Sequence, residues 1–187
     1  PLKGLIDPAA MARMTVGEAL TNIVWARVSA LQDIKCSGNW MWAAKLDGEG
    51  AELYDAAVAL CETLIQLGIG IDGGKDSLSM AALAPTSGED ETVKSPGTLV
   101  ISAYVTSPDI TKTVTPDFKG ADHHIFFIDL SEGKVRLGGS ALAQVFDQVG
   151  DEAPDLERTD LLVKAFEVTQ RLIDERAIAS GHDRSDG

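Results

Sequence analysis

Apolar residues recur at the spacing of an α-helix in three stretches of the chain. The first follows Asp7-Pro8, a capping residue and a proline suited to a first helical turn. Farther along it, Thr15 and Glu18 have capping-box spacing, which predicts that a second helix begins there or that the first restarts. The second stretch ends at Gly68, a typical helix end. The third runs from about residue 156 to residue 179, so three amphipathic helices are expected.

Runs of β-branched and apolar residues predict strands between these helices. The strongest run is residues 98–105, and shorter buried strands are expected at 69–71 and 125–128. Residues 33–46 are rich in Gly, Ser and Asn, which favours an irregular loop with a buried aromatic end at its tryptophans. Residues 84–94 are polar and predict a hairpin tip or a surface loop. The order of elements predicts a mixed α/β fold.

Residues 108–120 contain two prolines and no apolar period, so they are the best candidate for a linker. A second unit then follows, with a helix expected from Gly138-Gly139-Ser140 to about Gln148. We therefore divide the chain into residues 1–116 and 117–187. The first and last residues resemble neither a natural start nor a finished C-terminus, and we expect a piece of a longer polypeptide.

Composition narrows the class of protein. The chain has 187 residues, 44% of them hydrophobic, and a mean hydropathy of +0.03, values typical of a soluble globular protein. Its 29 acidic and 16 basic residues give a net charge of −13, which argues against binding nucleic acid or an anionic membrane. Cys36 and Cys61 lack metal-type spacing, so each is expected to be a small buried residue in a reducing, cytoplasmic setting.

The segment from Asp72 to Met80 combines two glycines, a lysine, two carboxylates and two hydroxyls in nine residues. Glycine N–H groups beside Lys75 would suit a phosphate, although Asp76 stands where a P-loop needs Ser or Thr. The alternative is a tight Gly73-Gly74 turn followed by a capped helix. The residue pattern leaves both interpretations open.

Oxygen ligands occur at two distant places. Glu18 and Asn22 are four positions apart on a predicted helix and could coordinate Mg²⁺, although Glu18 could be a capping acid and Asn22 simply solvated. Residues 182–187 add Asp183 and Ser185, or form an ordinary polar turn. Gly138-Gly139-Ser140 could bind an anion or only cap a helix. No arrangement typical of a nucleophilic enzyme can be assembled from the three histidines and two cysteines.

Five stretches taken together resemble one known family. They are residues 16–22, 35–45, 72–80, 107–117 and 181–187. In this order and spacing they are similar to phosphoribosylformylglycinamidine synthase of the large, single-chain type, an ATP- and glutamine-dependent ligase of purine biosynthesis. The resemblance covers essentially the whole chain but only an internal part of that long enzyme.

The resemblance implies a fold of the aminoimidazole-ribonucleotide-synthetase type. Residues 1–116 would be the later part of the second N-type subdomain, and 117–187 the start of the second C-type subdomain. In the family this half helps to hold an auxiliary nucleotide, ATP or ADP, with Mg²⁺. By residue match, Glu18, Asn22 and Asp183 would be metal ligands and Ser185 would touch the nucleotide. The role of the Gly73–Asp76 loop stays open.

The remaining domains of the same polypeptide, including a glutaminase domain, would be the partners of this segment. A further metal-binding Asp, the glutaminase triad and the catalytic His of the active half have no match in these residues, so the segment itself is not expected to be catalytic. Two alternatives remain: a non-catalytic nucleotide-binding scaffold module, or a stand-alone ATP-dependent kinase or cyclo-ligase of the same superfold.

Overall fold

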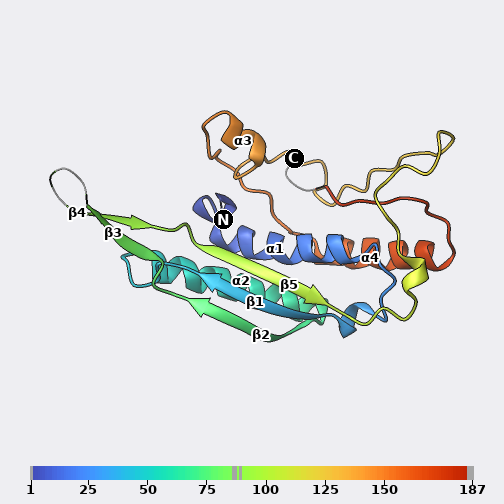
Figure 1. Ribbon diagram of the computed structural model, residues 1–187, viewed down its shortest axis with the longest axis horizontal. Helices are drawn as coiled ribbons and strands as arrows, with labels where there is room; N and C mark the ends of the chain where they lie inside the picture. Colours follow the sequence, from blue (N-terminus) through green and yellow to red (C-terminus); the bar gives the residue numbers. More distant parts are fainter. Residues whose placement is uncertain (1, 86–87, 89, 185–187) are drawn as a thin grey trace.

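The structure is a computed structural model that describes residues 2–85, 88 and 90–184. Its elements follow one another along the chain as a short 3-10 turn, two long helices interleaved with strands, a hairpin, a last strand and two further helices (Figure 1). The helices are α1 (Pro8–Ile23), α2 (Glu49–Leu67), α3 (Ala141–Val145) and α4 (Thr159–Asp174). The strands are β1 (Lys35–Met41), β2 (Gly70–Ser77), β3 (Ala81–Pro85), β4 (Asp90–Lys94) and β5 (Thr98–Tyr104).

The sheet has the order β2-β1-β5, with β1 parallel to β2 and antiparallel to β5. Helix α2 makes the crossover that a parallel pair needs. Strands β3 and β4 form a separate hairpin that projects from one end of the sheet (Figure 1). The mixed α/β class is thus confirmed. Of the two structures predicted for residues 84–94, a hairpin tip or a surface loop, the structure has a hairpin, but its paired strands include residues 84–85 and 90–94.

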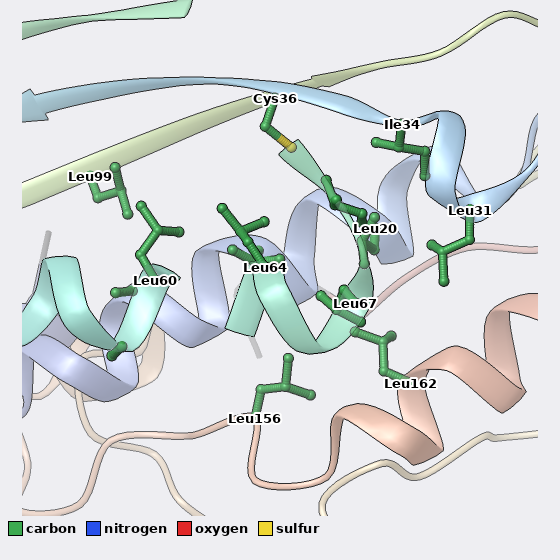
Figure 2. Packing of buried hydrophobic residues seen from close by; sticks show 14 of the residues in the cluster. Leu20, Leu31, Ile34, Cys36, Leu60, Leu64, Leu67, Leu99, Leu156 and Leu162 are labelled. Atoms are coloured by element: carbon green, nitrogen blue, oxygen red, sulfur yellow. The ribbon is translucent and has the colours of Figure 1, made fainter. Parts of the chain in front are cut away.

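The core lies between the sheet and the helices. Figure 2 shows leucines of α1 and α2 meeting Cys36 of β1 and Leu99 of β5, with Leu156 and Leu162 closing the core beside α4. The buried aromatic end predicted at Trp40 and Trp42 is confirmed for Trp42, which is fully buried directly after β1, whereas Trp40 is only partly buried. Cys36 is buried as expected, whereas Cys61 is exposed on α2, so the prediction of two buried cysteines is wrong for Cys61.

Helix α1 begins and continues for local reasons. Asp7 caps it by accepting a hydrogen bond from the Ala10 N–H over 2.8 Å. The predicted restart at Thr15 is wrong, because the helix is unbroken and the Thr15 hydroxyl donates to the Met11 carbonyl inside it. Glu18 is therefore no capping-box acid. At the end of α2, Gly68 has a φ of +69° and closes the helix as predicted.

Residues 35–41 form the central strand, not the loop that their composition predicted. Strand β1 is paired on both sides, so tertiary pairing outweighs the low strand propensity of its Gly, Ser and Asn residues. Gly38 is buried between its neighbours: a Cβ atom there would lie 3.6 Å from side-chain atoms of Ile71 and Ile101. These are ordinary contact distances, so the space beside Gly38 does not by itself require a glycine.

The segment Gly73–Asp76 is also a strand, not a glycine loop. It belongs to β2 and pairs with β1, and the register shifts so that Asp72 is an extra residue between the pairs Cys36–Ile71 and Ser37–Gly73. A Cβ atom on Gly74 would overlap the carbonyl group of Gly38. Both the predicted phosphate cradle and the predicted turn with a following helix are wrong as local structures, because the glycine permits close approach of two backbones.

The second unit is less regular than predicted. Residues 125–128 form no strand, and their apolar side chains are exposed. Helix α3 has five residues and ends at Val145, short of Gln148. Helix α4 spans Thr159–Asp174, and the residues that flank it inside the predicted range are not helical. A boundary at residues 116 and 117 remains a prediction.

Candidate functional site

Glu18 and Asn22 lie on the exposed side of α1. Because the helix is continuous through both residues, their side chains project from one face, one turn apart. The opposite face carries Val16 and Leu20, which are almost fully buried. Core packing therefore fixes the rotation of α1 and points the predicted ligand pair at solvent.

Asp183 reaches this face from the other end of the chain. Its carboxylate oxygen Oδ2 accepts a hydrogen bond from the Asn22 amide, with 3.3 Å between the atoms. The side chain of Asp183 is only 5% exposed, and His182 Nδ1 lies 3.1 Å from its other oxygen. Two of the three predicted metal ligands are therefore in direct contact, although 161 positions separate them in the sequence.

The Asn22 amide turns its nitrogen, and not its oxygen, toward Asp183. Its nitrogen donates to the Glu18 backbone carbonyl over 2.9 Å as well as to Asp183. An amide whose nitrogen is engaged in this way presents its oxygen on the other side. Because a hard cation binds the amide oxygen, an ion shared by Asn22 and Asp183 would require this amide to turn over.

Residues 180–184 are held by contacts with the segment after β5. Gly181 N–H donates to the Thr115 carbonyl over 3.3 Å, and the Ser180 hydroxyl donates to the Asp117 carbonyl over 2.5 Å. The guanidinium of Arg184 lies 5.2 Å from the centre of the Phe127 ring. The predicted linker thus packs beside the candidate site and holds the segment that carries Asp183.

Charged groups also hold the linker in place. Hydrogen bonds from Lys119 and Thr115 lower the pKa of Asp117 to about 2. Hydrogen bonds from Lys112 and Arg27 lower the pKa of Asp174 at the end of α4. The Lys112 and Arg27 contacts with Asp174 are each 2.8 Å long and join the linker, the end of α4 and the segment after α1.

Gln170 was not anticipated from the sequence, although it holds the chain directly after α1. Its amide nitrogen donates to the carbonyls of Val24 and Ala26 over 2.7 and 2.9 Å, and its oxygen accepts from Val28 N–H over 3.0 Å. A single glutamine on an amphipathic helix gives no signal of this role, since the partner backbone groups lie about 145 positions away.

The donor set is compatible with Mg²⁺. Two carboxylates and one amide are hard oxygen ligands, and this ion ordinarily completes its shell with water and phosphate oxygens. Within the part of the chain that the structure describes, no cluster of three or more His, Cys, Asp or Glu side chains could hold a metal on its own. Ser185, the predicted nucleotide contact, lies outside the described residues.

Two other predicted motifs have structural roles at their own positions. Gly73 and Lys75 are in β2, at the edge of the described sheet, and not on α1. Ser140 caps α3 by accepting from the Ala143 N–H over 3.1 Å, and Gly139 has a φ of +68° that glycine tolerates well. The geometry at residues 138–140 is that of a helix cap.

Known proteins similar to this chain are large enzymes. It is 63% identical to "Probable phosphoribosylformylglycinamidine synthase, chloroplastic/mitochondrial" of Arabidopsis thaliana, and 56% and 58% identical to phosphoribosylformylglycinamidine synthase of Homo sapiens and of Drosophila melanogaster. Each match covers 100% of this chain but only 13–14% of the relative, so the chain spans about a seventh of their length. No helix among the described residues is long and apolar enough to cross a membrane.

A family model described as the FGAR-AT PurM_N-like domain matches residues 1–106, from the first turn to just beyond β5. The matched region contains the whole three-stranded sheet, both long helices that pack on it and the Glu18–Asn22 pair. It therefore includes more than half of the residues and nearly all of the regular core. The chain belongs to the FGAR-AT PurM_N-like domain family.

Proposed function

We propose that this chain is a segment of a phosphoribosylformylglycinamidine synthase, the ligase that converts formylglycinamide ribonucleotide to formylglycinamidine ribonucleotide with ATP and glutamine. The support is the identity of 56–63% to three proteins so named, sustained over the full length of the chain. The other domains of that polypeptide, including a glutaminase domain, would be its partners. A cytoplasmic location stays a prediction, since one relative is named as chloroplastic/mitochondrial.

Within that enzyme, the segment would hold an auxiliary Mg²⁺–nucleotide. Glu18, Asn22 and Asp183 would supply oxygen ligands to the ion, and Ser185 would contact the nucleotide, ADP or ATP. The observation that carries this proposal is the Asn22–Asp183 hydrogen bond, since it joins two predicted ligands from opposite ends of the chain. Glu18 stands one turn away on the same face of α1.

The role of such a site would be structural. A ligand that binds only the folded state stabilises it by an amount that grows with the ligand concentration relative to Kd. The ion would bridge α1 of the first unit and the 180–184 segment of the second. The net charge of −13 makes a bound cation especially favourable, because it offsets carboxylate repulsion.

The decisive test is nucleotide retention by the purified full-length protein. The protein is passed through gel filtration in Mg²⁺, denatured, and the supernatant chromatographed. The expected result is about one ADP or ATP per polypeptide after denaturation. When EDTA is present, the nucleotide should instead be lost from the protein during gel filtration. Absence of nucleotide, together with a melting temperature that Mg²⁺ and ADP leave unchanged, would remove the support for this site.

Exchange of the retained nucleotide with labelled ATP separates a structural role from a catalytic one. If the retained nucleotide is auxiliary, it persists through many turnovers of the synthase without exchanging with labelled ATP. Rapid exchange with turnover would instead indicate that the site takes part in the reaction.

A further inference from the structure

Gly181 stands two positions before Asp183 and packs closely against the indole ring of Trp25. A Cβ atom on residue 181 would overlap Cζ3 and Cε3 of that ring and would lie 2.7 Å from Cη2. The backbone of Gly181 does not have a positive φ. The glycine is therefore required for closeness to the ring and not for backbone conformation.

Trp25 cannot easily move away from this contact. It lies two residues beyond the end of α1, in the stretch whose neighbouring carbonyls at Val24 and Ala26 are held by Gln170. Its ring packs on the hydrophobic core, and its indole Nε1 is buried. A side chain added at position 181 would thus displace residues 181–183 and not the tryptophan.

A second connection runs between the same two residues through the linker. The Trp25 carbonyl accepts a hydrogen bond from Val114 N–H over 2.8 Å. The carbonyl of Thr115, the residue that follows Val114, accepts one from Gly181 N–H over 3.3 Å. Trp25 therefore fixes Gly181 twice, once by its ring and once through a backbone bridge. Asn22 lies three positions before Trp25 and contacts Asp183, so the connections form a closed loop.

We propose that Gly181 and Trp25 are positioning residues for the metal site, a proposal that rests on the function proposed above. They fix the distance between the backbone of residues 181–183 and the end of α1, and thereby bring the Asp183 carboxylate to Asn22. Neither residue offers an oxygen side chain to the ion. Their effect on it would pass entirely through Asp183.

The test is the Mg²⁺ concentration that half-protects the bound nucleotide against release, measured on the full-length protein. Gly181→Ala and Trp25→Ala should raise that concentration about tenfold or more, the usual cost of losing support for a metal ligand. Excess Mg²⁺ should restore retention in both variants. The matched control is Gly120→Ala, because a Cβ atom there would meet only His123 at 3.7 Å. It should leave the Mg²⁺ requirement unchanged.

A merely structural role predicts a different pattern. It would lower the melting temperature of nucleotide-free Gly181→Ala as much as that of the loaded protein, and excess Mg²⁺ would rescue nothing. Either result, or an unchanged Mg²⁺ requirement, would overturn the positioning role. Absence of retained nucleotide in the unsubstituted protein would instead refute the proposed function on which it rests, and the two failures are distinguishable. Trp25→Phe, which keeps an aromatic ring, should raise the half-protecting Mg²⁺ concentration less than Trp25→Ala does.

Discussion

The Asn22 amide donates to the Asp183 carboxylate over 3.3 Å and so joins the C-terminal end of α1 to the last described residues of the chain. The contact places a nearly buried carboxylate on an exposed helix face. A nearly buried carboxylate in a protein of net charge −13 is stabilised in its ionised form by a nearby cation. The first prediction follows from this arrangement.

Replacing Asp183 by Asn, or Glu18 by Gln, should lower the melting temperature of the nucleotide-loaded protein and change that of the nucleotide-free protein little. The reason is that an amide keeps the size and hydrogen-bonding oxygen of the carboxylate but loses the charge that holds Mg²⁺. Glu167→Gln, at an exposed position of α4, is a matched control. Equal destabilisation of both forms would show that Glu18 and Asp183 act only within the fold.

Replacing Gln170 by Met should destabilise the protein by about 2–3 kcal/mol, since it leaves the Val28 N–H and two carbonyls without their buried partner. Urea unfolding measures the change. Gln148→Met, at an exposed position, is the control and should fall within about 0.5 kcal/mol of the parent. A Gln170→Met variant as stable as the control would mean that water replaces the lost contacts.

The two glycines of β2 should respond differently to alanine. Gly74→Ala drives a Cβ atom into the Gly38 carbonyl and should cost about 1–3 kcal/mol. At Gly73 the same atom would lie 3.7 Å from the Ser37 hydroxyl oxygen, so Gly73→Ala should be nearly neutral. Chemical denaturation of both variants provides the comparison. Similar losses would imply that backbone freedom, and not strand contact, explains both glycines.

Arg13 and Asp155 should be coupled. Two hydrogen bonds of 2.7 and 2.8 Å join the guanidinium on α1 to the carboxylate before α4, and both side chains are largely shielded from solvent. We expect an interaction energy of about 1–3 kcal/mol from a double-mutant cycle with Arg13→Met and Asp155→Asn. Additive single effects would show that the pair is no stronger than an exposed ion pair.

Asp117 should contribute stability that depends on pH. Its pKa is about 2 in the folded chain against an ordinary 3.8, because Lys119 and Thr115 bond the ionised form. A lowered folded pKa means that the contribution is complete above about pH 4 and is lost as the pH falls towards 2. Carboxyl NMR titration of Asp117 tests this, with Asp117→Asn identifying the signal. A midpoint near 3.8 would contradict the hydrogen-bonded arrangement.

Elements that form through contacts within a few residues can be predicted from their local signals. Asp7-Pro8 begins α1 and Gly68 ends α2 through contacts within a few residues, and the β-branched run of β5 carries its own strand preference. The stripes of apolar residues also placed Glu18 and Asn22 together on one face of a helix, because helix geometry alone fixes that spacing. The resemblance of several motifs added Asp183 and Ser185 as candidates, which spacing could not do.

Features that depend on distant partners appear only when the chain is folded. Residues 35–41 and 72–77 look like loops in the sequence, yet they become strands because each satisfies its backbone against the other, with glycine at the closest approach. The apolar residues 125–128 form no strand within the described part of the chain, since a strand needs a pairing neighbour. In the same way, only the folded chain brings Asp183 to Asn22. The backbone bridge through Thr115 and the close contact of Gly181 with Trp25 connect residues that local spacing cannot relate.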